Sequence, residues 1–145
     1  MKLSVTKVSR EQDEEVILRC YDENAKWVRD ICAIVAGEHS VVGVRDAKTF
    51  RLKLSDVYYF EVVDGRSFLY CREQVYECRL KLYEFEMLSN RTMFFRSAKS
   101  MILNADKIEC VRPAVSGRFE ATLTNGEKVI ISRQYVSSLK RLLGI

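Results

Sequence analysis

Apolar and polar residues alternate along most of the chain, which is the period expected of β-strands. The first two runs of this kind are residues 2–8 and 15–21, and we expect them to pair as a hairpin around an acidic connection. Over residues 25–36 the apolar positions recur at helical spacing, with Asn24 as a candidate cap. The pattern therefore predicts a β-β-α extension over residues 1–44.

Beyond this extension, Asp-Ala-Lys, Asp-Gly-Arg and Asn-Gly mark tight turns between short apolar runs. The pattern predicts strands over residues 41–45, 49–54, 57–63, 67–72, 93–96, 107–112, 118–123 and 128–131. Helices are predicted over residues 79–88 and 133–143. In the first of them, the face expected to be buried comprises Leu80, Tyr83, Met87 and Leu88. The fold class is therefore mainly β (α+β), a compact antiparallel β assembly with small helices over residues 45–145.

The composition is that of an ordinary folded protein. Hydrophobic residues make up 48% of the 145 residues and charged residues 30%, which argues against a disordered or collagen-like chain. The apolar runs are far shorter than the roughly 20 residues of a membrane-spanning helix. The amino terminus also lacks the features of a secretory signal. We therefore expect a cytoplasmic protein without membrane insertion.

Charge is distributed unevenly along the chain. Residues 1–50 hold eight basic and nine acidic side chains, whereas residues 51–145 hold sixteen and eleven. From Arg91 onward there are ten basic residues against four acidic ones. A positive surface of this kind attracts phosphate backbones, although a solvated basic face would have the same composition.

Few residues suit catalysis or metal binding. The five cysteines are scattered without a Cys-x-x-Cys pair, and His39 is the only histidine. We therefore expect reduced, buried cysteines, without a disulfide framework or a metal site. The sequence also lacks a glycine-rich phosphate loop. It supports neither an enzyme nor a cofactor.

A polar break in residues 94–104 is the first candidate for nucleic-acid contact. Arg96, Lys99 and Ser100 stand there between apolar anchors, from which they can reach phosphates or bases. From the spacing alone, a surface loop without any partner is the more frequent case.

Two further candidates are the start of the closing helix and one turn. Arg133 and Gln134 begin that helix, and a helix amino terminus attracts phosphate. Ordinary solvation of a first helical turn explains them equally well. The turn at residues 64–67 contains Arg66 and Ser67, but a simple hairpin connection accounts for it more directly.

Three segments, in this order, resemble the LytTR family of DNA-binding domains. Residues 95–104, Phe-Arg-Ser-Ala-Lys-Ser-Met-Ile-Leu-Asn, look like the family's aromatic-Arg-x-x-basic-Ser-x-Ile/Val-Val/Leu-Asn segment. Residues 123–136 are similar to its terminal hairpin, Ser-Arg-x-Tyr turn and final helix, and residues 56–61 resemble its opening strand. The similarity covers residues 45–145.

The resemblance implies a bacterial, sequence-specific transcriptional regulator whose loops enter successive major grooves of double-stranded DNA at paired short repeats. Because no receiver domain precedes the DNA-binding part, the chain resembles the stand-alone type. We expect a homodimer, at least on DNA, with residues 1–44 as a dimerisation element. The alternative is a protein-interaction or ligand-sensing β module without strong DNA affinity.

The resemblance also points to individual DNA contacts. Asn104 is among them, although its place beside an apolar run suits a supporting role as readily. The full set is Arg66, Ser67, Arg96, Lys99, Ser100, Asn104, Arg133 and Gln134.

Overall fold

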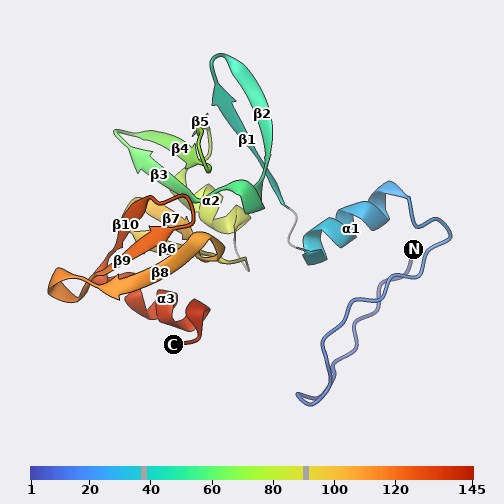
Figure 1. The fold of residues 1–145 in the computed structure, drawn as a ribbon. Coiled ribbons are helices and arrows are strands. Elements are labelled where there is room, and N and C mark those ends of the chain that lie inside the picture. The colour runs from blue at the N-terminus through green and yellow to red at the C-terminus, as the bar shows by residue number, and fades with distance from the viewer. Residues whose placement is uncertain (37–38, 90–91) are drawn as a thin grey trace. The chain divides into compact units, whose positions relative to one another are not determined.

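The computed structural model describes residues 1–36, 39–89 and 92–145 and divides the chain into two units, Met1–Ala36 and Gly37–Ile145 (Figure 1). The first unit contains helix α1 (Lys26–Ala36), which confirms the helix predicted there. The two strands predicted before it do not form: the chain has no regular secondary structure over residues 2–8 and 15–21. Their apolar side chains stay in solvent, and an isolated two-stranded hairpin without a buried face is marginal in water.

Within the described part of the second unit, ten strands form two antiparallel sheets (Figure 1). The larger sheet has the strand order β2-β1-β5-β4-β3-β7-β6, and the smaller one has the order β10-β9-β8. The strands are β1 (Ser40–Arg45), β2 (Lys48–Lys53), β3 (Tyr59–Val63), β4 (Arg66–Tyr70), β5 (Val75–Cys78), β6 (Phe94–Ala98), β7 (Met101–Asn104), β8 (Ile108–Pro113), β9 (Phe119–Leu123) and β10 (Lys128–Ile131). This arrangement confirms the predicted mainly β class.

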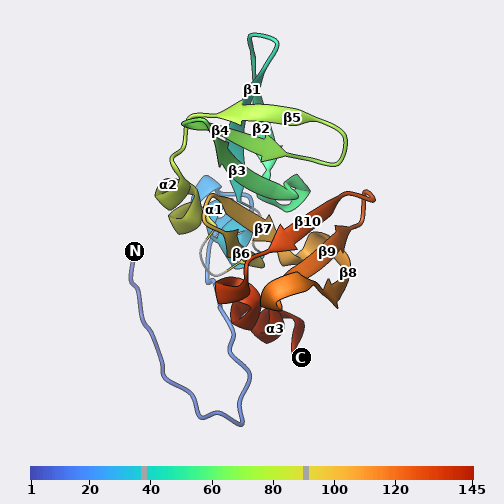
Figure 2. The same ribbon diagram turned by 90° about the vertical axis from the view of Figure 1, so that its left-hand side faces the viewer.

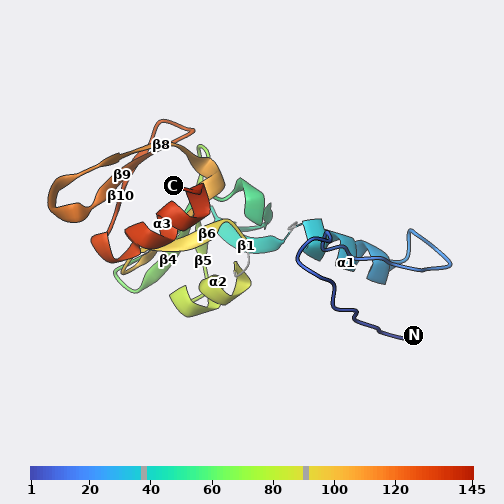
Figure 3. The same cartoon turned by 90° about the horizontal axis from the view of Figure 1, so that it is seen from below.

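Short helices complete the unit. Helix α2 (Leu82–Leu88) follows β5, and helix α3 (Val136–Leu143) closes the chain. Figures 2 and 3 show α2 on one side of β6 and β7, and the smaller sheet with α3 on the other side. The single-turn helices are η1 (Leu54–Asp56), η2 (Ala105–Lys107), η3 (Val115–Gly117) and η4 (Arg133–Tyr135). None of the described helices is long and apolar enough to cross a membrane.

The larger sheet separates two hydrophobic cores. Successive side chains of a strand point to opposite faces, so neighbours in sequence belong to different cores. On β3, Tyr59 packs with the smaller sheet and α3, whereas Phe60 packs with α2. On β7, Leu103 and Ile102 divide in the same way. Strands β3 and β7 are thus covered on both faces, which holds the turns at their ends on a rigid base.

The face of α2 that is buried differs from the predicted one. Tyr83 is 62% exposed and Met87 75% exposed, whereas Phe85 is fully buried. The Phe85 ring stacks on Phe60, with ring centres 4.4 Å apart. Since the helix is less than two turns long and apolar on several sides, its spacing alone could not select the buried face.

The cysteines also depart from the prediction. All five are free, but Cys20, Cys32 and Cys110 are exposed and Cys71 is half-buried. Only Cys78 is buried, and burial raises the pKa of its thiol. The expected burial was therefore wrong for the other four.

Candidate nucleic-acid interface

A tight turn joins β3 to β4 and presents Arg66 at the start of β4. Asp64 and Gly65 have φ angles of 52° and 74°, the left-handed geometry that brings the two strands back into register. The Arg66 guanidinium is exposed and donates two hydrogen bonds to Glu77 on β5, at 3.1 and 2.7 Å. This pairing lowers the pKa of the Glu77 carboxyl.

Ser67 lies next to Arg66 but faces the protein interior. It is 8% exposed and pairs with Cys78 across β4 and β5. Of these two predicted DNA contacts, only Arg66 offers its side chain to solvent.

The turn between β6 and β7 is organised by Arg96. Its Nε donates to the Ala98 carbonyl at 3.0 Å, and its Nη2 donates to the Lys99 carbonyl. Its Nη1 donates to the Glu86 carboxylate of α2 at 3.1 Å. The guanidinium carbon also lies 6.0 Å from the centre of the Tyr135 ring, within cation–π range. Arg96 therefore ties the turn to α2 and η4.

The other predicted residues of this segment differ in exposure. Lys99 is exposed at the tip of the turn, and Ser100 is half-buried. Asn104 is buried: its Nδ2 donates to the Val57 carbonyl at 3.0 Å, and its Oδ1 accepts from the backbone N–H of Asp106 at 3.1 Å. The structure thus separates an outward-facing Lys99 from an inward-facing Asn104.

Arg133 and Gln134 are exposed on η4, immediately after β10. Within the described residues, the Ser132 side chain makes no capping hydrogen bond to this turn. Instead, the Ser132 carbonyl accepts from the backbone N–H of Tyr135 at 2.9 Å. The start of the closing helix is therefore a single 3-10 turn that continues into α3.

Backbone contacts join these segments into one row. Val63 pairs with Arg66, and the Val62 N–H donates to the Ser100 carbonyl at 2.9 Å. At the other side of the turn, the Ser132 N–H donates to the Ser97 carbonyl at 2.8 Å. We call this row, made of residues 64–67, 96–100 and 132–135, the rim.

The rim is wide enough to matter for DNA. From β4 through β3 and β7 to β6 there are three strand steps of about 4.8 Å, or roughly 14 Å, and the end of β10 lies beyond β6. The major groove is about 12 Å wide. Figures 1 and 3 show the β3–β4 turn and the β10–α3 connection on the same side of the unit. The rim can therefore span a groove and its bordering phosphates.

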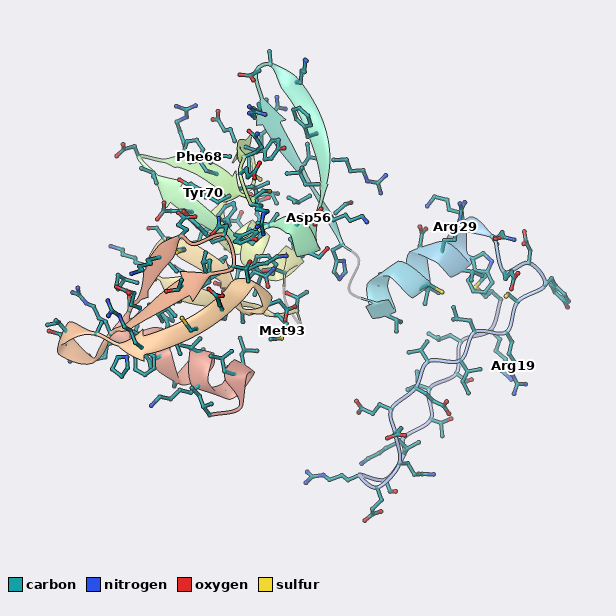
Figure 4. The ribbon with its side chains drawn as sticks, in the orientation of Figure 1. Arg19, Arg29, Asp56, Phe68, Tyr70 and Met93 are labelled. Atoms are coloured by element: carbon teal, nitrogen blue, oxygen red, sulfur yellow. The ribbon has the colours of Figure 1, made fainter. Side chains whose placement is uncertain are left out.

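Polar contacts fix the smaller sheet against the larger one. The hydroxyls of Tyr58 and Thr124 lie 2.8 Å apart, and the Tyr59 hydroxyl donates to Glu127 at 2.5 Å. Burial, followed by the hydrogen bond to Glu127, raises the pKa of Tyr59. The Tyr59 ring also stacks on Tyr70, which Figure 4 labels on β4. These contacts position β10, and with it η4, relative to the rest of the rim.

The sequence did not predict the two residues that hold the Arg96 side chain, Tyr135 and Glu86. The Ser-Arg-x-Tyr motif places Tyr135 near the site, but nothing in the sequence indicates its contact with Arg96. Glu86 contacts Arg96 from a different element, and no spacing rule links the two residues. Elsewhere in the described residues, no group of three His, Cys, Asp or Glu side chains could hold a metal ion.

An apolar cavity of about 370 Å³ lies apart from the rim residues. It is lined by four residues of β1, by Thr49 of β2 and by Cys78, Arg79, Leu80 and Leu88. Its lining has no residue in common with the rim.

Comparisons with known proteins identify the family. The family model described as the LytTr DNA-binding domain matches residues 47–144. A sensory transduction protein LytT of Enterococcus faecalis is 33% identical over 90 residues, which cover 62% of this chain and 37% of that protein. An uncharacterized HTH-type transcriptional regulator of Staphylococcus aureus is 31% identical over 107 residues, covering 74% of this chain and 72% of the relative.

Among solved structures, a LytTr DNA-binding domain from Bacillus cereus superposes with a TM-score of 0.68 at 28% sequence identity. The match covers 73% of this chain and 97% of that domain. The matched region contains all three rim segments, and the chain belongs to the family of LytTr DNA-binding domains.

Proposed function

We propose that this protein is a sequence-specific transcriptional regulator whose rim enters the major groove of double-stranded DNA at paired short repeats. The observation that carries the proposal is the row of backbone contacts between turns. It brings Arg66, Lys99 and Arg133 together at one end of the strands. Exposed cations on a rigid edge can neutralise phosphates while neighbouring amide and guanidinium groups reach base edges. The family membership supports the same function.

The geometry favours different roles for the predicted contacts. Arg133 and Gln134 are exposed side by side and suit base reading, because Arg can grip guanine and Gln adenine bidentately. Lys99 suits phosphate contact, and so does Arg66, whose exposed guanidinium uses two of its five donors on Glu77 and lies at the β3–β4 turn of the rim. Ser100 would support Lys99 with a hydroxyl contact at the same turn.

The remaining three residues act best as supports for those contacts. Arg96 spends three hydrogen bonds on the turn and on Glu86, out of the five donors of a guanidinium. Ser67 and Asn104 are buried. We therefore assign the shape of the rim to these residues and the DNA contacts to the exposed ones.

Residues 1–44 are proposed to promote a homodimer on paired repeats. Exposed apolar side chains support this role, because a large exposed apolar surface on a folded protein usually marks a site of interaction with a partner. They include Leu3, Val5, Val16, Ile17, Ile34 and Val35. Light scattering should show a dimer that is lost when residues 1–36 are removed. A monomer at every concentration, with and without DNA, would contradict this proposal.

The main test is fluorescence anisotropy with DNA from the protein's own promoter and with random DNA over a range of salt. With about four to six phosphate contacts, log affinity should fall with log salt at a slope of roughly −4 to −5. A slope near zero, or no binding at low salt, would exclude the DNA-binding function.

One observation favours the alternative of a ligand-sensing β module, namely the apolar cavity of about 370 Å³ beside β1. Its volume is within the range of small-molecule sites. A protein that used only this cavity would bind an apolar ligand with weak salt dependence, and would show no preference for promoter DNA.

A further inference from the structure

We infer that the turn between β8 and β9, residues 114–118, is a fourth DNA-contacting segment, in which Gly117 seats Arg133 and Arg118 contacts a phosphate. The inference rests on the proposed function and extends it to a segment outside the predicted contacts.

The strand register places this turn at the end of the rim. Ile131 of β10 pairs with Phe119 of β9. The next residues along the two strands, Ser132 and Arg118, therefore continue the row beyond Ser97. Figures 1 and 3 show the β8–β9 turn on the same side of the unit as the β10–α3 connection.

The turn touches a proposed base-reading residue directly. A Cβ atom at Gly117 would lie 2.9 Å from Cδ and 3.1 Å from Cγ of Arg133, so the aliphatic stem of Arg133 rests on the Gly117 backbone. Gly117 also has a φ of 74°, which disfavours any side chain there. The turn thus sets the direction in which Arg133 leaves η4.

The turn is ordered and presents groups that suit DNA. The Ala114 N–H donates to the Arg118 carbonyl at 2.8 Å, which closes the turn. Val115 is 82% exposed, and a small apolar side chain at a groove can contact a thymine methyl. Arg118 is exposed as well, and it has no ion pair within residues 1–36, 39–89 and 92–145.

Distance explains why a phosphate is the fitting target for Arg118. From β4 to β6 the row covers three strand steps of about 4.8 Å, or roughly 14 Å, and the β8–β9 turn lies beyond its end, next to Ser132. This length exceeds the width of one major groove, about 12 Å. When the centre of the rim occupies the groove, its end lies over the bordering backbone.

The test compares Arg118→Gln with Arg112→Gln in the full chain, using anisotropy over a salt series. Arg112 lies on the adjoining strand β8 and loses the same charge, but it is paired with Glu120 at 3.0 Å. We expect Arg118→Gln to flatten the salt slope by about 0.9 and to weaken binding roughly eightfold at 0.1 M salt, as one phosphate contact predicts. Arg112→Gln should keep the slope of the wild type.

A second measurement locates the contact on the DNA. Methylphosphonate substitution, one phosphate at a time, should reveal a position that weakens the wild type but has no further effect on Arg118→Gln. If the wild type binds and the two variants have equal slopes, or no such position exists, this inference is wrong while the proposed function stands. If the wild type itself does not bind DNA, both are wrong.

Discussion

The Nη1 atom of Arg96 donates a hydrogen bond to the carboxylate of Glu86 at 3.1 Å, so a basic side chain of the rim is held by an acidic side chain of α2. The pair is partly open to solvent, with 29% of the Arg96 side chain and 52% of the Glu86 side chain exposed. Ion pairs of this kind contribute only about 0–1 kcal/mol to stability. For the proposed DNA contact the Glu86 charge is more important, because a carboxylate at the rim repels phosphates.

Glu86→Gln should therefore strengthen DNA binding. Glutamine can still accept the hydrogen bond from Arg96, while the repulsion of nearby phosphates is removed. At a separation of about 10 Å in water, repulsion between the carboxylate and one phosphate costs roughly 0.4 kcal/mol. Two such phosphates, partly screened by salt, predict about a two- to fourfold gain in affinity at low salt. Anisotropy measures the gain, and Glu109→Gln on β8 serves as a charge-matched control. Weaker binding by Glu86→Gln would show that the carboxylate is needed to hold the turn.

Substitutions of Arg96 separate shape from charge. Arg96→Ala should weaken DNA binding by about 1–3 kcal/mol. Arg96→Lys keeps the charge but cannot reach the carbonyls of Ala98 and Lys99 with a planar fork, so we expect most of the same loss. Affinity is measured by anisotropy and folding by circular dichroism. Full recovery with lysine would mean that Arg96 acts through its charge on DNA.

Lys99→Gln and Arg133→Ala should weaken binding in different ways. Each is expected to cost about 1–3 kcal/mol without a comparable loss of stability, because both side chains are exposed. Loss of the phosphate contact from Lys99 should weaken all DNA sequences alike, whereas loss of Arg133 should relax the preference at one base pair. Binding to a set of single-base operator variants measures this difference. Unchanged affinity in both folded variants would remove these residues from the interface.

The turns were predictable from the sequence because their causes are local. Asp-Gly and Asn-Gly steps favour positive φ, and the structure has hairpins at Asp64-Gly65 and Asn125-Gly126. Strand β7 was missed since Ile102, Leu103 and Asn104 are all buried, which removes the alternation that marks a strand. Strand β5 was missed because the connection before it, residues 71–74, contains no Gly, Pro, Asn or Asp that would mark a turn.

The candidate site was predictable in part for a related reason. Residue type and motif indicated Lys99 and Arg133, whose side chains the structure leaves exposed. The partners of Arg96 come from α2 and η4, and the seat of Arg133 comes from the β8–β9 turn. Such contacts arise only when separate segments pack together, and the period of a single segment carries no information about them.

The pH dependence of stability should change with Glu61→Gln. Burial is the main cause that raises the pKa of Glu61, with repulsion from Glu127 adding to it, although a hydrogen bond from Tyr70 opposes the shift. A carboxyl whose pKa is raised by folding favours the folded state below its unfolded pKa, about 4.3, and loses that contribution as pH rises through the folded pKa. Glu61→Gln should therefore melt higher than the wild type at pH 7–8.

The difference between these two proteins should disappear near pH 4, where the wild-type carboxyl is also neutral. Thermal melting by circular dichroism from pH 4 to 8 measures it. A variant that is less stable than the wild type at pH 8 would show that the Tyr70 hydrogen bond to the charged carboxylate outweighs the cost of burial.

Asn104→Ala tests whether this residue supports the rim or contacts DNA. Its amide is buried and bonded to the Val57 carbonyl and the Asp106 N–H, so removing it leaves two backbone groups without their partner. We expect a loss of about 1–3 kcal/mol in the free energy of unfolding.

Leu139→Ala is the control for a purely structural change: the side chain is fully buried, and its loss should cost about 2–5 kcal/mol. Chemical denaturation and anisotropy at a temperature where all proteins are folded measure both effects. If folded Asn104→Ala loses affinity far beyond folded Leu139→Ala and the preference for one base pair relaxes, then Asn104 contacts DNA; equal affinity in the two folded variants assigns it to support of the rim.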